Sequence, residues 1–313
     1  MIKSKKWAAG RLIPLVCVLL TLSVLAALLL PPFLRAENDT LETTSYEITN
    51  QKLPASFDGY RIVMLTDLHS KVFGNRNDVL IKSVEEAEPD IVLVCGDTLN
   101  SRDRSDFGAV FLDLCRVLSK SYPVYIVYGN HEQRRADLNN IERTYAKLVE
   151  AAGGQMLTGK KVALSRAGET INLYGLDLPY IYYIPLNRGA LSLFTPEEER
   201  YFAEDVVQVL GEADSSQFNL LLTHNPKRFA AYADWGADLV LSGHEHGGII
   251  RLPLIGGLAT SPASTTDRTR YDAGLFERNG RQIIVGRGLG GAVIPYRIFN
   301  RPEVVAVTLR AAG

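Results

Sequence analysis

The chain has 313 residues and a formal net charge of −1 at pH 7, and 46% of its residues are hydrophobic. Lysine and arginine are spread along the chain without a basic patch, so we expect no nucleic-acid partner. The three cysteines, Cys17, Cys95 and Cys115, provide no disulfide framework. The length that follows the amino-terminal segment fits one domain of about 260 residues.

An uncharged segment near the amino terminus, Leu12–Leu30, is long enough to cross the ~30 Å hydrocarbon layer of a bilayer. Basic residues precede it and mainly acidic residues follow it: Lys3, Lys5, Lys6 and Arg11 before, and Arg35, Glu37, Asp39, Glu42 and Glu47 after. Because basic flanks stay in the cytoplasm, we expect a single-pass anchor with the rest of the chain outside. The alternative is a cleaved signal peptide, although Leu34–Ala36 is a poor cleavage site.

Five short apolar runs, rich in β-branched and aromatic residues, come after the anchor. They are Tyr60–Leu65, Ile91–Cys95, Val124–Tyr128, Phe218–Leu222 and Asp238–Leu241. Turn-forming residues close each run, which is typical of strands. Near-continuous apolar runs of this kind indicate strands that are buried on both faces.

The segments between the first runs carry apolar residues at helical spacing. We expect helices over Asn77–Ala87, Phe107–Leu118, Leu138–Ala152 and Pro196–Leu210. Alternating strands and helices predict an α/β fold with right-handed crossovers. The remaining pattern favours further strands over Val162–Leu164, Ile171–Tyr174, Gly248–Leu252, Gln282–Val285 and Val304–Leu309.

All five histidines of the chain lie in short motifs that directly follow apolar runs. The motifs are Thr66-Asp67-Leu68-His69, Gly129-Asn130-His131-Glu132, Thr223-His224-Asn225 and Gly243-His244-Glu245-His246, and Gly96-Asp97 completes the set. Functional groups of an α/β sheet are exposed at the carboxyl ends of its strands. Most of these motifs alone have an ordinary structural explanation, whereas two alternate histidines such as His244 and His246 are rarely structural. The joint pattern with no histidine left over predicts a metal site.

The residue types suit a particular chemistry. Two divalent ions roughly 3.5–4 Å apart can hold both the attacking and the leaving oxygen of a displacement at phosphorus. Imidazoles, carboxylates and an amide oxygen suit Mn, Zn or Fe rather than Ca. Asp67 and His69 are two residues apart, so both can turn toward one metal. Asn130 and His131 are adjacent, so one can bind a metal while the other faces the substrate.

In order and spacing, these motifs resemble those of the calcineurin-like metallophosphoesterases. The family pattern is Asp-x-His, Gly-Asp, Gly-Asn-His-Glu or -Asp, a single His, and Gly-His-x-His, and the resemblance covers Tyr60 to His246. The resemblance implies a four-layer α-β-β-α sandwich of two mixed sheets with flanking helices, here preceded by one transmembrane helix. It also implies a metal-dependent hydrolase of phosphoric esters, either a phosphodiesterase or a phosphomonoesterase.

The resemblance further implies a role for each motif residue. One metal would be held by Asp67, His69, Asp97 and His246, and the second by Asp97, Asn130, His224 and His244. Asp97 would bridge the two ions together with a hydroxide that serves as the nucleophile. His131 would be a catalytic residue and not a ligand. It would either donate a proton to the leaving oxygen or stabilise the negative charge on the phosphoryl group.

With this assignment the chain divides into a basic cytoplasmic tail (1–11), a transmembrane anchor (12–34), a stalk with the first strand (35–55) and a metallophosphoesterase domain (56–313). We expect a phosphoester substrate, with lipid- or envelope-linked esters among the candidates. One alternative is a lipid pyrophosphate hydrolase of the UDP-diacylglucosamine type, although related enzymes act on the cytoplasmic side. The other is a non-catalytic metal-binding scaffold, although such proteins typically lose a ligand or the proton donor.

Two further segments are candidates for substrate selection. The tyrosine-rich segment Leu178–Leu186 either packs in the core or forms a cap over the metal site or an edge that rests on the membrane. The glycine-rich segment Gly286–Gly291 lets the backbone approach a phosphate, and we expect a substrate-side role for its Arg287. Together with Pro295–Pro302, it resembles the tail of membrane-anchored metallophosphoesterases of the cell envelope.

Overall fold

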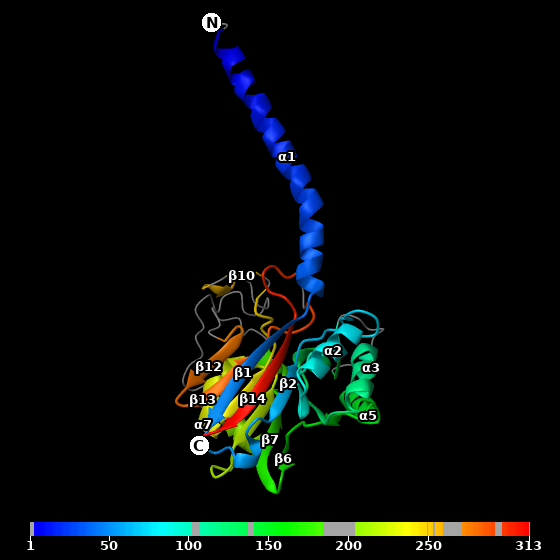
Figure 1. Ribbon diagram of the computed structural model, residues 1–313, viewed down its shortest axis with the longest axis vertical. Helices are drawn as coiled ribbons and strands as arrows, with labels where there is room; N and C mark the ends of the chain where they lie inside the picture. Colours follow the sequence, from blue (N-terminus) through cyan, green and yellow to red (C-terminus); the bar gives the residue numbers. More distant parts are fainter. Residues whose placement is uncertain are drawn as a thin grey trace.

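The computed structural model describes residues 3–101, 107–136, 141–183, 204–248, 250–252, 254–258, 271–291 and 296–312. A long helix, α1 (Lys3–Asp39), projects from one end of an α/β domain (Figure 1). Within its segment Pro14–Asp39 an 18-residue stretch has a mean hydropathy of 2.5, so the segment is long and apolar enough to cross a membrane. The described apolar part of α1 is not buried against the domain, which is what a helix surrounded by lipid requires.

Twelve of the described strands form two sheets of six strands each. The first sheet has the order β1 (Glu42–Asn50), β14 (Glu303–Ala311), β2 (Arg61–Leu65), β3 (Ile91–Val94), β4 (Val124–Ile126) and β5 (Gln155–Met156). The second has the order β12 (Gly274–Arg278), β13 (Arg281–Val285), β9 (Leu239–Ser242), β8 (Asn219–Thr223), β7 (Glu169–Leu176) and β6 (Lys160–Arg166).

Both sheets are mixed, as predicted. Strands β2, β3, β4 and β5 run parallel, whereas β14 is antiparallel to β2 and parallel to β1. In the second sheet β13, β9, β8 and β7 run parallel between the antiparallel edge strands β12 and β6. The parallel centres of the two sheets therefore place several strand ends at one side of the molecule.

Three hydrophobic cores separate the four layers, and the alternation along each strand builds them. On β2, Ile62 and Met64 face the core between the two sheets, whereas Val63 and Leu65 face the helices α2 (Asp78–Glu86), α3 (Ala109–Leu118) and α5 (Ile141–Ala151). On β8, Leu221 instead faces the helix α7 (Phe229–Trp235). Since both faces of these strands are buried, the apolar runs in the sequence are nearly continuous.

The four-layer sandwich is confirmed, with some differences at the level of elements. The third predicted helix begins at Ile141 among the described residues, and residues 137–140 and 184–203 lie outside them. The strand predicted over Gly248–Leu252 is shorter than expected. Only β10 (Arg251–Leu252) forms, paired with β11 (Gly256–Gly257), because Gly247 and Gly248 adopt positive φ angles of 64° and 82° that turn the chain.

Candidate metal centre

The predicted site residues lie at the carboxyl ends of parallel strands from both sheets. Asp67 and His69 follow β2, Asp97 follows β3, Asn130 and His131 follow β4, His224 follows β8, and His244 and His246 follow β9. Their ligand atoms form three overlapping groups, each with all atoms within 4.8 Å of one another: Asp67, His69 and His246; His69, Asp97 and His131; and Asp97, His224 and His244. The fold thus brings together the aspartates and histidines that the sequence pattern singled out.

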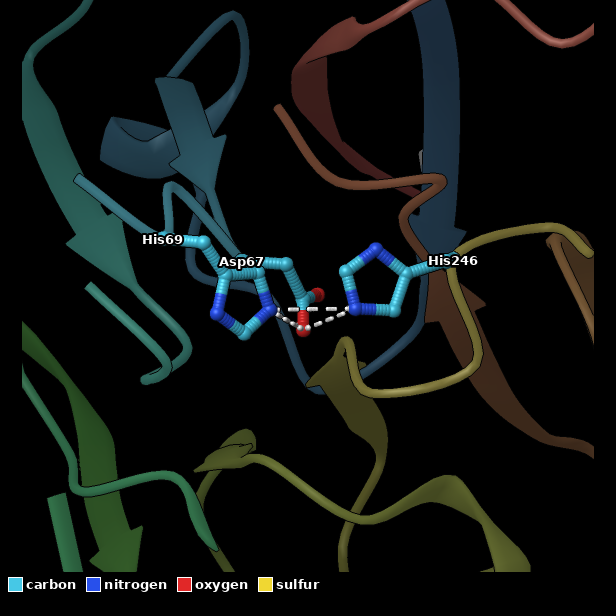
Figure 2. A group of neighbouring side chains, drawn as sticks. All are labelled: Asp67, His69 and His246. Carbon is cyan, nitrogen blue, oxygen red and sulfur yellow. Dashed lines mark hydrogen bonds and ion pairs between the residues drawn. The ribbon is translucent and has the colours of Figure 1, made fainter. Parts of the chain in front are cut away.

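Figure 2 shows the first group. The Nε2 atoms of His69 and His246 lie 3.1 Å apart, and Oδ1 of Asp67 lies 3.3 Å from Nε2 of His246 and 3.8 Å from Nε2 of His69. Donor atoms that bind one ion at about 2.0–2.2 Å lie roughly 3–3.5 Å from one another. Two of these three spacings therefore match a shared divalent ion, and the third is slightly wider.

Asp97 lies between this group and the second histidine pair. Its Oδ2 atom is 3.7 Å from Nε2 of His69 and 3.3 Å from Nε2 of His224. The same oxygen atom therefore faces a nitrogen of each group. Such an arrangement allows one carboxylate to contact two cations at once.

The carboxylates of Asp67 and Asp97 are each held by hydrogen bonds to one oxygen, while the other oxygen faces the centre. Oδ1 of Asp97 accepts a hydrogen bond from the backbone N–H of His131 at 2.7 Å. Oδ2 of Asp67 accepts from Oγ1 of Thr66 at 2.8 Å and from the N–H of His244 at 3.0 Å.

Two buried oxygens of the predicted ligands have no hydrogen-bond partner among the described residues, Oδ1 of Asp67 and Oδ1 of Asn130. Buried polar atoms are nearly always satisfied, so such atoms call for an explanation. Both are atoms that a metal ion would take as ligands, and both belong to predicted metal ligands. The donor set of the centre therefore fits divalent ions such as Mn, Zn or Fe.

Backbone contacts set the orientation of two histidine rings. His224 lies with Nδ1 2.6 Å from the carbonyl oxygen of Cys95, so Nδ1–H donates there and Nε2 faces the centre. This is the second contact that metal-binding histidines commonly make. In His131 the contact is of the opposite kind, because the N–H of Ser101 donates to Nδ1 at 3.1 Å. A neutral His131 ring therefore carries its proton on Nε2.

Burial keeps three of the other imidazoles neutral, whereas carboxylates determine the charge of His224. It lowers the pKa of His69 to about 3 and that of His246 to about 3, and it holds the pKa of His244 well below the usual value. These rings are therefore neutral at pH 7 and available as ligands. Burial also lowers the pKa of His224, but the carboxylates of Asp97 and Asp67 outweigh it and raise the value to about 10. Metal binding at His224 would therefore release a proton.

Glu132 fixes the loop that carries Asp97. Its carboxylate accepts hydrogen bonds from the N–H groups of Asp97 at 2.9 Å, Thr98 at 2.7 Å, Leu99 at 3.2 Å and Gly129 at 2.8 Å. This set joins the loop after β3 to the loop after β4. Glu132 therefore positions the centre without facing it.

The site loops are closely packed and conformationally strained. Five predicted ligands have positive φ angles, which are uncommon for residues other than glycine: Asp67 (51°), His69 (47°), Asp97 (51°), His244 (76°) and His246 (55°). Such conformations cost about 1–3 kcal/mol each and concentrate at functional sites. A Cβ atom on Gly129 would lie 2.2 Å from Oδ1 of Asp97, and one on Gly243 would lie 1.9 Å from Oγ1 of Thr66. Glycine is therefore required at both positions.

Two residues at the centre were not singled out individually from the sequence. The buried Arg297 places Nη2 3.4 Å from Nδ1 of His246 and donates to the carbonyl oxygen of Gly290 at 2.5 Å. Tyr183 is buried, and its ring lies 5.1 Å from the ring of His244, centroid to centroid, in an edge-on arrangement. Tyr183 also belongs to the core beside α7, so the described part of the tyrosine-rich segment both packs in the core and contacts the centre.

The contacts of Arg287 differ from the expected substrate-side role. Its Nη2 atom lies 2.9 Å from Glu303 and 3.0 Å from Glu42, so it links β14 to β1. The carboxylate of Glu303 also accepts from the backbone N–H of Arg287 at 2.8 Å. With its charge engaged by two carboxylates, Arg287 has a structural role in the first sheet.

Similarity to known proteins agrees with this geometry. Metallophosphoesterase YkuE of Bacillus subtilis is 28% identical over 280 residues, which are 88% of this chain and 88% of that protein. Phosphodiesterase YaeI of Escherichia coli is 25% identical over 295 residues, which are 88% of this chain and 97% of that protein. A transmembrane protein with a metallophosphoesterase domain from Bos taurus is 26% identical over 280 residues, which are 86% of this chain and 57% of that protein.

Residues 60–248 match the sequence model of the family described as calcineurin-like phosphoesterase. This range covers more than half of the chain and contains every predicted metal ligand and His131. The chain therefore belongs to the calcineurin-like phosphoesterases and is a hydrolase that acts on phosphoric ester bonds.

Proposed function

We propose that the chain is a two-metal hydrolase of phosphoric esters that is anchored at the outer face of the cytoplasmic membrane. The observation that carries the two-metal assignment is the position of Asp97, whose Oδ2 atom faces His69 on one side and His224 on the other. A single carboxylate oxygen between two groups of imidazoles is the arrangement that a pair of ions would need.

The proposed ligands divide into two sets that share Asp97. Asp67, His69, Asp97 and His246 would hold one ion, and Asp97, Asn130, His224 and His244 would hold the other. When bound, such a pair of ions activates water and stabilises the charge on the attacking and leaving oxygens. The fixed oxygens of Asp67 and Asp97 keep their carboxylates in place, so that the site is formed before the substrate arrives.

The proposed role of His131 follows from its hydrogen bonds. Ser101 donates to Nδ1, so the neutral ring presents Nε2–H as a donor. An imidazolium would carry a proton on Nδ1 as well, which would oppose the N–H of Ser101. We therefore assign His131 to hydrogen-bond donation toward a phosphoryl oxygen that gains charge. Of the two roles left open by the sequence, this one requires no proton to leave the ring.

The proposed orientation rests on the charges that flank α1. The anchor (12–34) follows the basic tail (1–11), and the stalk with its first strand (35–55) leads to the catalytic domain (56–313). Basic residues on the amino-terminal side favour retention of that side in the cytoplasm. The continuous α1 helix supports a span, since it runs through Pro14, Pro31 and Pro32 without a break.

Substitution of the shared carboxylate tests the two-metal assignment. Asp97→Ala should lose both ions, because each ligand set would lose a member, and elemental analysis of purified full-length protein measures this directly. The matched control is Asp113→Ala, which removes an exposed carboxylate of α3 that pairs with Arg116. We expect two ions per chain in the parent protein and in the control. One ion or none in active parent protein would show that the assignment is wrong.

Substitution of His131 tests its assignment as a catalytic residue. His131→Ala should keep its metal content and lose about 10²–10³-fold in kcat, the usual effect of removing one donor to a charged oxygen. The loss should be similar for alkyl and nitrophenyl esters, because donation to a phosphoryl oxygen does not depend on the leaving group. A much larger loss with alkyl esters would assign the donor to the leaving oxygen instead. The comparison variant His244→Ala should lose metal and fail equally on both esters.

The position of the carboxyl terminus tests the orientation. Alkaline phosphatase fused after Gly313 should be active, because this enzyme matures only outside the cytoplasm, whereas a fusion directly after Arg11 should be inactive. The full-length protein should also stay with the membrane after a salt wash. Recovery of full-length protein in the soluble cytoplasmic fraction would contradict the anchor.

A further inference from the structure

Strand directions place the metal centre and the anchor at the same end of the molecule. Strand β14 runs antiparallel to β2 and parallel to β1, so the amino end of β1 lies at the carboxyl end of β2. Helix α1 ends at Asp39, shortly before β1 begins, and Asp67 follows the end of β2. Figure 1 shows α1 leaving the domain from this end. The centre is therefore on the side of the domain that faces the proposed membrane.

The base of α1 is joined to the domain close to the centre. Oδ1 of Asn38 accepts from the backbone N–H of Arg297 at 3.1 Å, and the guanidinium of Arg297 reaches Nδ1 of His246. Oε1 of the buried Glu37 accepts from Nε of Arg301 at 2.9 Å. A single residue, Arg297, thus connects the anchor helix to a histidine of the centre. This contact limits how far the centre lies from the membrane.

The level of the membrane surface can be located along α1. From Leu12 onward the first charged residue is Arg35, so the hydrocarbon layer ends near Leu34. At this level the ring of Phe33 meets the ring of Phe299 edge-on, with centroids 5.8 Å apart. Phe299 and the nearby Tyr296 remain 57% and 53% exposed. Aromatic side chains favour this layer, where apolar chains meet the headgroups.

A second apolar feature lies beside this segment. The turn between β10 and β11 exposes Leu254 and Ile255, and Leu258 directly follows β11. Ile255 and Leu258 are 68% and 55% exposed. The N–H of Arg251 donates to the carbonyl oxygen of Ile298 at 3.0 Å, which joins this hairpin to the segment that carries Phe299. Strand β10 lies at the end of the domain from which α1 leaves (Figure 1). Grouped exposed apolar side chains of this kind mark an interaction surface.

We propose that these side chains form an apolar rim that rests in the interfacial layer of the outer leaflet: Leu254, Ile255, Leu258, Tyr296 and Phe299. The partner is the lipid bilayer, because the rim is continuous with the helix that crosses it through the contact of Phe299 with Phe33. The inference rests on the proposed anchor. Its consequence is that the centre is held at the bilayer surface, within reach of phosphoesters carried by lipids.

A fluorescent probe on the rim tests this inference in the full-length chain. Ile255→Cys is made in a Cys17→Ser background, labelled with an environment-sensitive nitrobenzoxadiazole group and placed in lipid nanodiscs, while Cys95 and Cys115 remain buried. We expect blue-shifted emission that is quenched by lipids with a spin label near the headgroup. The matched control is Ala167→Cys, an exposed position in the β6–β7 turn, which lies at the far end of the domain from α1 in Figure 1.

The possible outcomes distinguish failure of the rim from failure of the anchor. An Ile255 probe that behaves like the Ala167 control, in protein that stays in the nanodisc, would overturn the rim and leave the anchor intact. Blue-shifted emission without lipid quenching would mean that a protein surface, such as a second copy, covers the rim instead. Protein that does not enter nanodiscs would overturn both. The same probe at Leu258 is a second labelling position, which controls for a local change in the turn caused by the substitution at Ile255.

Discussion

The rest of the centre depends on the carboxylate of Asp97, whose two oxygens have different partners. One oxygen accepts from the backbone of His131, and the other faces imidazoles from both sheets, His69 after β2 and His224 after β8. Asp97 keeps this position because Glu132 binds the backbone on both sides of it and because Gly129 leaves room for its side chain. Burial opposes ionisation of Asp97, but His224 outweighs it and holds the pKa of Asp97 well below the usual value. The carboxylate is therefore charged before any cation binds.

The four-layer architecture supplies the rigidity that such a centre needs. Strands buried on both faces cannot shift without opening two cores, so their carboxyl ends are held at fixed positions. The loops that leave these ends then carry residues in left-handed conformations, and the packing around them compensates for the strain. The same strand directions place the centre at the end of the domain where α1 begins. Core packing, site geometry and the relation to the membrane thus follow from one arrangement of strands.

The pattern of strands and helices predicted an α/β fold, and the family resemblance of the motifs implied the sandwich. The motif residues that the fold gathers could be recognised in the sequence because each motif directly follows an apolar run. It could not reveal the contacts made between distant segments. Arg297 reaches His246 only after the chain has passed through β12 and β13, and nothing in its local sequence distinguishes it from Arg287. Arg287 was the more prominent candidate because of its glycine neighbours, yet two carboxylates engage it. The ring orientation of His131 likewise depends on Ser101, which no motif includes.

The central claim is that Asp97 joins two metal ions into one centre. Electron paramagnetic resonance of the full-length protein loaded with Mn²⁺ measures this directly, because two ions bridged through one carboxylate oxygen are magnetically coupled. The account predicts the spectrum of an exchange-coupled Mn²⁺ pair at two ions per chain. A spectrum of isolated Mn²⁺ ions only, at the same occupancy, would contradict it.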